Sequence, residues 1–153
     1  MKLERVVIVV LAIGGLAVFA SGDVALHRRY IEPLSAAADA TQPPYSGAVL
    51  VGDTLYLSGD TGVASGAKAL PEPAVEARVL MESFERRLAA ASMTMDDLVY
   101  VTVYSSDVQD YGVFNTEYRK HFHHEFPARA YIGVGKLLDG ARWEMQGIAV
   151  RRR

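Results

Sequence analysis

The sequence contains no cysteine among its 153 residues. This absence excludes disulfide bonds, thiolate zinc sites and cysteine nucleophiles from the chain. A domain of this length buries most of the surface of its unfolded chain and needs no such cross-link. The fold must therefore be stabilised by a hydrophobic core, and the hydrophobic composition of 50% is sufficient for one.

An excess of positive charge is also missing, since the formal net charge is -2. Nucleic-acid binding proteins usually carry a basic field that neutralises phosphates. The one dense basic run, Arg151 to Arg153, lies at the C-terminal end and reads as a solvated tail. We therefore expect no nucleic-acid partner.

The N-terminus has the pattern of a signal peptide or a membrane anchor. Lys2 and Arg5 precede fifteen residues without a charge, Val6 to Ala20, and small residues follow. A bilayer span needs about 20 apolar residues, so this run is short for an anchor. A buried N-terminal element is the weaker alternative, because the run does not alternate as an amphipathic element does.

These patterns divide the chain into three parts. We predict a signal peptide or anchor over residues 1–22, a linker over residues 23–43 and one domain over residues 44–153. The domain is then expected in the periplasm or elsewhere outside the cytoplasm. If residues 6–22 are not cleaved, they would anchor the domain to the inner membrane. They would then be its only contact with a membrane.

The body of the chain alternates between strand and helix patterns. Pro73 suits the first turn of a helix that runs to about Ala91. Its predicted inner face is apolar, with charged residues such as Glu76 and Arg87 mostly on the other side. The inner face comprises Val75, Val79, Leu80, Phe84 and Leu88. A second helix is predicted over 110–123, and strands over 48–51, 55–58, 98–104, 129–135 and 142–150.

This order, β-β-α-β-α-β-β, predicts an α+β domain in which two helices pack on one mixed sheet. The strands are too apolar for the second face of the sheet to stay in water. No segment is left to cover that face, so self-association is expected.

Four motifs of the body resemble signatures of the reactive intermediate deaminase family, known as Rid or YjgF. The sharpest is Phe126-Pro127-Ala128-Arg129-Ala130, in which Pro-Ala-Arg enters a strand. The others are Pro44 to Val49 with Leu57-Ser58-Gly59, Val103 to Val108 with Asn115 to Tyr118, and Ile148-Ala149-Val150.

The resemblance implies a chorismate-mutase-like fold, a homotrimer and a ligand cleft between subunits. Known members hydrolyse enamines and imines to 2-oxo acids and ammonia, without a metal or cofactor. A non-catalytic protein that binds a small carboxylate is the alternative. A ribonuclease, a label that some members carry, is disfavoured by the net charge.

The resemblance also assigns binding residues. Arg129 aligns with the arginine that binds the substrate carboxylate, a role that its planar guanidinium suits. Tyr45 aligns with the tyrosine that closes the cleft, Ser58 with a residue at its edge and Asn115 with a polar group of the second helix. Tyr131 stands where the family often has cysteine, and we expect its ring to narrow the pocket.

Two residues of the last strand are candidates for activating the attacking water. Counting back from the end of Ile-Ala-Val places Gln146 where deaminating members have a glutamate. A carboxamide orients water but does not accept its proton. Glu144 lies two residues earlier on the same face of the strand and could substitute. On this count Gln146 would lie beside Arg129.

Three histidines at the end of the second helix could suggest a metal. His121 and His124 are one helical turn apart, a spacing that helical metal ligands use. Histidines in a last turn also interact favourably with the helix dipole. We therefore predict no metal site there and read His121, His123 and His124 as a solvated helix end.

Overall fold

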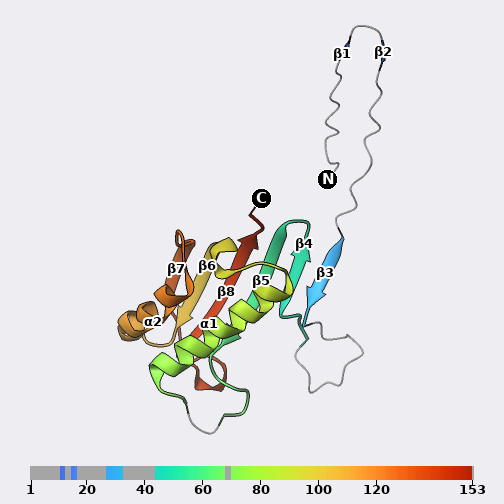
Figure 1. Ribbon diagram of the computed structural model, residues 1–153. Helices are drawn as coiled ribbons and strands as arrows, with labels where there is room; N and C mark the ends of the chain where they lie inside the picture. Colours follow the sequence, from blue (N-terminus) through green and yellow to red (C-terminus); the bar gives the residue numbers. More distant parts are fainter. Residues whose placement is uncertain (1–10, 13–14, 17–26, 33–43, 68–69, 153) are drawn as a thin grey trace.

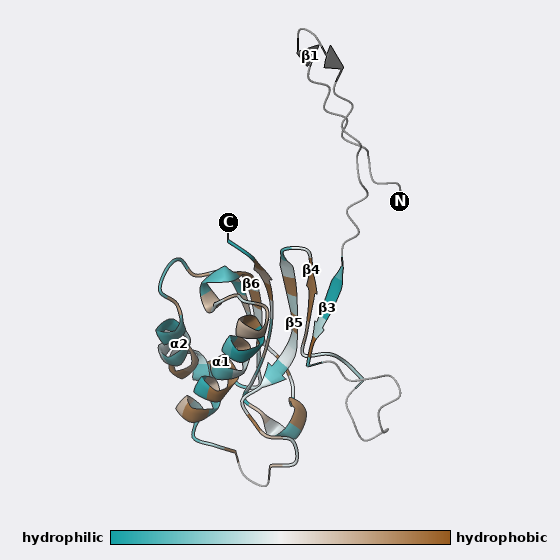
Figure 2. Ribbon diagram, turned by 45° about the vertical axis from the view of Figure 1, so that its right-hand side comes forward, coloured by the Kyte–Doolittle hydropathy of each residue, from teal (hydrophilic) through white to brown (hydrophobic). Residues whose placement is uncertain are grey.

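The computed structural model describes residues 11–12, 15–16, 27–32, 44–67 and 70–152. A six-stranded mixed sheet, in the order β3-β4-β5-β8-β6-β7, forms one layer. Helices α1 and α2 form the second layer on one face of the sheet (Figures 1 and 2). The strands are β3 Arg28–Ile31, β4 Ala48–Val51, β5 Thr54–Thr61, β6 Leu98–Ser105, β7 Ala128–Gly133 and β8 Trp143–Val150.

The α+β class and the element order predicted from the sequence are confirmed. β4 and β5 form the predicted hairpin through Gly52, whose φ of 60° suits glycine. β6 and β7 pair in parallel, whereas the other neighbouring strands of this sheet are antiparallel. β3 is an addition, because four residues of the segment predicted as a linker pair with β4 at the sheet edge.

The N-terminal predictions fall largely outside the described residues. β1 Leu11–Ala12 and β2 Gly15–Leu16 pair with each other in an antiparallel arrangement. The rest of residues 1–26 and residues 33–43 are outside the described part of the chain. The domain boundaries at residues 22 and 43 therefore stay predictions.

Helix α1, Pro73–Ala90, has the predicted length, but its buried face is rotated from the predicted one. Val79 is exposed, whereas Ala77, Met81 and Glu76 are fully buried. The small side chain of Ala77 lets the helix approach the sheet closely. Leu80, Phe84 and Leu88 are buried as predicted and contribute to a core with Leu55, Val101, Val103, Phe114, Trp143 and Met145.

Glu76 is buried because it is paired, which its sequence pattern does not reveal. Its Oε2 lies 2.6 Å from Nη1 of Arg142, and its Oε1 accepts hydrogen bonds from the backbone N–H groups of Arg142 and Trp143. Burying a carboxylate is costly unless a cation and hydrogen bonds compensate it. The pair therefore joins α1 to the beginning of β8.

Helix α2, Tyr111–Tyr118, is shorter than predicted and continues as a 3-10 turn, Arg119–His121. Phe114 and Tyr118 are buried as part of the predicted aromatic stripe, whereas Tyr111 is exposed. The tighter turn changes the direction of the side chains that follow Tyr118.

The sheet face away from the helices carries a row of large side chains. The strand register aligns Tyr30, Val49, Tyr56, Ile148 and Tyr100 across five neighbouring strands. The tyrosines at positions 30, 56 and 100 are 51%, 50% and 43% exposed. No helix covers this row within the part of the chain that the structure describes (Figure 1).

Replacing Arg142 tests the buried ion pair. Arg142→Met leaves the carboxylate of Glu76 buried without its cation, so we expect the free energy of unfolding to fall by about 3–5 kcal/mol. Urea denaturation followed by circular dichroism measures the change. The exposed pair Arg78 and Glu82 provides the control, because Arg78→Met should change stability by less than about 1 kcal/mol. Equal effects of the two substitutions would contradict the role given to Arg142.

Candidate functional site

Arg129 lies on β7, where its guanidinium is fixed by one hydrogen bond and several aromatic rings. Its Nη2 donates to Oδ1 of Asn115 at 2.7 Å. Its Cζ lies 4.6 Å from the centroid of the Tyr118 ring, and the rings of Tyr111, Phe114 and Tyr131 lie within 5.9 Å. Such cation–π contacts hold a guanidinium in place without neutralising it. Among the described residues, Arg129 makes no ion pair with a carboxylate.

A small cavity of about 170 Å³ opens beside Arg129. We call it the arginine cavity. It contains two guanidinium groups, those of Arg119 and Arg129, and no acidic residue lines it. Its other lining residues are Asn115, Tyr118, Phe126 and Pro127. The predicted binding residues Arg129 and Asn115 therefore lie together at a site that suits an anion.

Two tyrosines near Arg129 have shifted pKa values. The hydrogen bond with Asn115 and the charge of Arg129 lower the pKa of Tyr111. Burial raises the pKa of Tyr118 to about 12, although the Arg129 charge opposes this. The Tyr118 hydroxyl is buried and has no hydrogen-bond partner among the described residues.

We expect the buried hydroxyl of Tyr118 to make stability fall at high pH. A tyrosine with a raised pKa in the folded state contributes stability below its unfolded pKa of about 10, and that stability is lost as the pH rises towards 12. Tyr118→Phe should therefore flatten this fall, and at pH 8 it should not destabilise, because the lost hydroxyl had no partner. Urea denaturation at pH 8, 10 and 11.5 measures both effects. Tyr30→Phe, at an exposed tyrosine, is the control and should leave the pH dependence unchanged.

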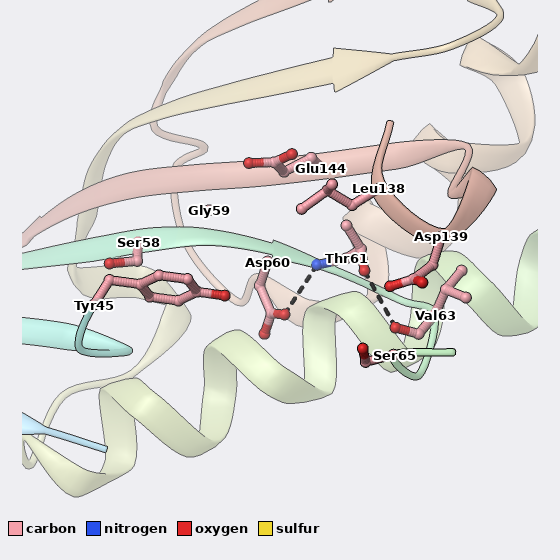
Figure 3. Close-up of a pocket in the computed structure, with 10 residues that line it drawn as sticks. All are labelled: Tyr45, Ser58, Gly59, Asp60, Thr61, Val63, Ser65, Leu138, Asp139 and Glu144. Carbon is pink, nitrogen blue, oxygen red and sulfur yellow. Dashed lines mark hydrogen bonds between the residues drawn. The ribbon is translucent and has the colours of Figure 1, made fainter. Parts of the chain in front are cut away.

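A second and larger cavity, of about 680 Å³, lies along the last part of β5 (Figure 3). We call it the acidic cavity. It brings together three of the predicted residues, Tyr45, Ser58 and Glu144. Ser58 donates a hydrogen bond from Oγ to the backbone oxygen of Ser46 at 2.7 Å. The other lining residues are Gly59, Asp60, Thr61, Val63, Ser65, Leu138 and Asp139.

Glu144 comes from β8 and lies over Gly59 of β5 (Figure 3). A Cβ atom at Gly59 would lie 2.2 Å from Oε1 of Glu144, which is impossible without displacing that carboxylate. Glycine at position 59 therefore leaves the space that the Glu144 carboxylate occupies.

This contact predicts the effect of a single added methyl group. Gly59→Ala should leave the fold intact, because only the flexible end of Glu144 must move, but it should displace the carboxylate from its place in the acidic cavity. We expect any activity that depends on Glu144 to fall at least about tenfold, since catalytic groups tolerate little displacement. Steady-state kinetics and a melting curve separate the two effects. A loss of folded protein would count against this explanation.

Gln146 and Arg129 lie on opposite faces of the sheet within one chain. β6 has Val101 as the neighbour of Arg129 and Thr102 as the neighbour of Gln146, and adjacent strand residues point to opposite faces. Nε2 of Gln146 donates to the hydroxyl of Tyr104 at 3.0 Å, and Gln146 lines neither cavity. The structure thus does not place Gln146 beside Arg129 of the same chain, and their proximity across a cleft between subunits stays a prediction.

Tyr131 does not enter either cavity. Its hydroxyl donates to Oγ of Ser105 at 3.1 Å and accepts from Nε1 of Trp143 at 2.9 Å. The ring packs edge-on against Tyr111. Two hydrogen bonds hold the hydroxyl towards the core, and the expected narrowing of the pocket stays a prediction.

The histidines make contacts with acidic residues of other elements. Nδ1 of His121 lies 2.7 Å from Oε1 of Glu85, and the backbone N–H groups of His123 and His124 donate to Asp96. Burial raises the pKa of Asp96, but these hydrogen bonds and the nearby histidines outweigh it and lower the pKa overall. Within the described residues no group of His, Cys, Asp or Glu is arranged to hold a metal ion.

Several cavity residues were not assigned a role from the sequence, among them Tyr118, Arg119, Phe126 and Asp139. Tyr118 and Arg119 follow Asn115 at helical spacing, which was the available signal for a shared face. Phe126 belongs to the Pro-Ala-Arg motif but was not assigned a contact. Asp139 carried no signal, because its place depends on a turn in which its φ is 52°.

Comparison with known proteins identifies the family. A family profile described as Endoribonuclease L-PSP matches residues 34–151. A protein of Bos taurus named 2-iminobutanoate/2-iminopropanoate deaminase is 38% identical over 119 residues, covering 76% of this chain and 87% of the relative. This chain belongs to the Rid (YjgF) family.

Solved structures agree with this assignment. The yjgF gene product of E. coli superposes on the Rid chain with a TM-score of 0.65 at 30% identity, over 71% of this chain and 89% of that one. Yeast Mmf1 gives a TM-score of 0.66 at 28% identity, covering 80% and 94%. The fold predicted from the family resemblance is thereby confirmed.

The predicted location outside the cytoplasm is wrong. A relative from Saccharomyces cerevisiae, 31% identical over 130 residues and matching 82% of this chain and 90% of its own, is named Protein MMF1, mitochondrial. A basic start before a short apolar run is a weak signal, because fifteen residues fall short of the roughly 20 that span a bilayer. The helices in the described part of the Rid chain include none that could cross a membrane.

Proposed function

We propose that this Rid protein hydrolyses 2-imino acids to 2-oxo acids and ammonia in a site shared by two copies of the chain. The proposal rests on the observation that the predicted site residues line two separate cavities. Arg129 and Asn115 line one cavity and Tyr45, Ser58 and Glu144 line the other. Arg129 and Glu144 point to opposite faces of the sheet, so one chain does not bring both to the same small ligand.

A second copy can bring the two cavities together. The exposed row of Tyr30, Tyr56 and Tyr100 gives an apolar surface for association, and burying it would be favourable. A homotrimer is the assembly that the family resemblance implies. In such an assembly the arginine cavity of one copy would face the acidic cavity of the next, and each site would hold a small carboxylate ligand.

The chemistry assigns one role to each cavity. Arg129 offers two parallel N–H donors to the carboxylate of the imino acid, because only one of its terminal nitrogens is used by Asn115. Glu144 accepts a proton from water as the oxygen attacks the imine carbon. The proton then passes to the nitrogen, which gives a carbinolamine. The Glu144 carboxylate next takes the proton of the carbinolamine hydroxyl and returns it to the nitrogen as the carbon–nitrogen bond breaks, so that ammonia and the 2-oxo acid leave.

Glu144 is the better candidate for the base than Gln146. It lines the cavity that also contains Tyr45 and Ser58, and a carboxylate can act as a base, which a carboxamide cannot. Gln146 lies outside both cavities and donates to Tyr104. The names of the mammalian relatives, 2-iminobutanoate/2-iminopropanoate deaminase, support the same reaction class.

The proposal predicts different outcomes for substitutions at two positions of β8, a large loss of activity at Glu144 and little change at Gln146. Glu144→Gln should lower ammonia release from freshly generated 2-iminopropanoate by about a hundred- to ten-thousandfold, the usual contribution of a general base. Gln146→Glu, which alters the same strand outside the cavities, should change the rate little. Arg129→Ala should abolish binding and turnover. If no variant or wild type releases ammonia above the uncatalysed rate while carboxylates still bind, the protein is a binding protein and not an enzyme.

Mixing two inactive variants tests whether the site is shared. In assemblies refolded from equal amounts of Arg129→Ala and Glu144→Gln chains, a site built from two copies is intact when each chain supplies its unaltered residue. About a quarter of the sites should then regain activity, given random assembly of a symmetric oligomer. Light scattering of the same samples gives the oligomeric state. A mixture as inactive as its components, in assemblies shown to contain both chains, would rule out the shared site.

A further inference from the structure

The two cavities carry opposite charge. Three carboxylates, those of Asp60, Asp139 and Glu144, line the acidic cavity, and none of its lining residues is lysine, arginine or histidine. The arginine cavity has Arg119 and Arg129 and no acidic lining residue. Joined in one site, the cavities would make a cleft that is positive at its small end and negative at its large end.

Of the three carboxylates, that of Asp60 is held in place by the most contacts. Its Oδ1 accepts a hydrogen bond from the backbone N–H of Thr61 at 2.9 Å. Its Oδ2 accepts a hydrogen bond from the hydroxyl of Ser83 and lies 3.0 Å from Nη2 of Arg87. These contacts hold the carboxylate in the cavity wall, where its side chain remains 25% exposed (Figure 3).

The charge of Asp60 is only partly compensated. Arg87 is buried, and its guanidinium is divided between two carboxylates, since Nε also pairs with Oε2 of Glu32 at 2.8 Å. One positive charge between two negative ones leaves a net charge of −1 in this group. Electrostatic attraction from Asp60 therefore extends into the cavity that its side chain lines.

Asp139 adds a second negative charge to the lining of the same cavity. Its Oδ1 accepts a hydrogen bond from the backbone N–H of Gly66 at 3.1 Å. Among the described residues it forms no ion pair with a cation. The acidic cavity thus combines a fixed carboxylate at Asp60 with a second one whose charge is not neutralised.

We propose that Asp60 determines substrate specificity by selecting 2-imino acids whose side chain ends in a positive charge. The inference rests on the proposed function, in which Arg129 takes the common carboxylate. The cavity of about 680 Å³ has room for the rest of the substrate, whereas that of about 170 Å³ suits the carboxylate. A guanidinium or ammonium group on the substrate gains from Asp60, and an acidic side chain is repelled.

Three small carboxylate ligands of similar length distinguish the effect of charge from the effect of size. They are 4-guanidinobutanoate, 4-ureidobutanoate and glutarate, whose far ends are positive, neutral and negative. Isothermal titration calorimetry on the full-length protein should rank their affinities in that order. The guanidino compound should bind up to about fivefold more tightly than its ureido analogue, because one partly exposed charge pair contributes up to about 1 kcal/mol. The difference should shrink in 0.5 M salt.

Asp60→Asn keeps the shape of the side chain and removes its charge. It should bring the affinities for the guanidino and ureido probes to within about twofold of each other, whereas Glu82→Gln, the same change of charge on the exposed face of α1, should leave the ratio unchanged. If Asp60→Asn weakens the fold, Asp139→Asn tests the same cavity and should reduce the ratio in the same direction.

The outcomes distinguish this inference from the proposed function. Equal affinities of wild type for the guanidino and ureido probes, tighter binding of glutarate, or an unchanged preference in Asp60→Asn would overturn the inference. A charge preference that depends on Asp60 in a protein that hydrolyses no imino acid would support the inference and overturn the enzyme. No binding of any probe would contradict both, since Arg129 is common to them.

Discussion

The buried ion pair between Glu76 and Arg142 determines how the parts of this domain meet. Arg142 directly precedes β8, and Glu76 occupies the first turn of α1, so the pair fixes the helix against the strand that carries Glu144. Gly62 lies against the backbone of Glu76 with no room for a side chain, which brings the end of β5 to the same point. The end of β5 and the beginning of β8 supply part of the wall of the acidic cavity, including Asp60 and Glu144.

The sheet separates the two residues to which the proposed function assigns ligand binding and proton transfer. Strand residues alternate between faces, so Arg129 joins the aromatic side chains on the helix side, whereas Glu144 points away from them. A single chain therefore holds the proposed carboxylate-binding group and the proposed base on opposite faces of its sheet. The exposed tyrosines of the other face give a physical reason for association, and association is what the proposed site requires.

The charged groups of the two cavities, Arg129 and Asp60, are held by different kinds of contact. Arg129 is surrounded by rings and by the amide of Asn115, which orient a cation but leave its charge available. Asp60 is held by Arg87 and Ser83, but Arg87 is shared with Glu32. Each cavity therefore keeps an excess of one sign, and this separation is the basis on which a ligand with charges at both ends would be recognised.

The sequence by itself determined most of the secondary structure of the domain and its family. The hairpin of β4 and β5, the length of α1 and the α+β order follow from local patterns of hydrophobicity and turn residues, because such patterns act between near neighbours in the chain. The Pro-Ala-Arg motif singled out Arg129, and the structure places Asn115 beside it. The end of α2 was placed too late, since the 3-10 turn after Tyr118 has no strong sequence signal.

Only the tertiary structure decided which residues share a cavity. The burial of Glu76 required Arg142, 66 positions away, and the inward hydroxyl of Tyr131 required Ser105 and Trp143. Counting along β8 favoured Gln146 over Glu144. Both residues face the same side of the sheet, and only the packing of β5 against β8 shows that Glu144 lies against Gly59 and lines the acidic cavity. Contacts between residues distant in the chain depend on how the elements pack, and a pattern along one strand holds no information about its neighbours.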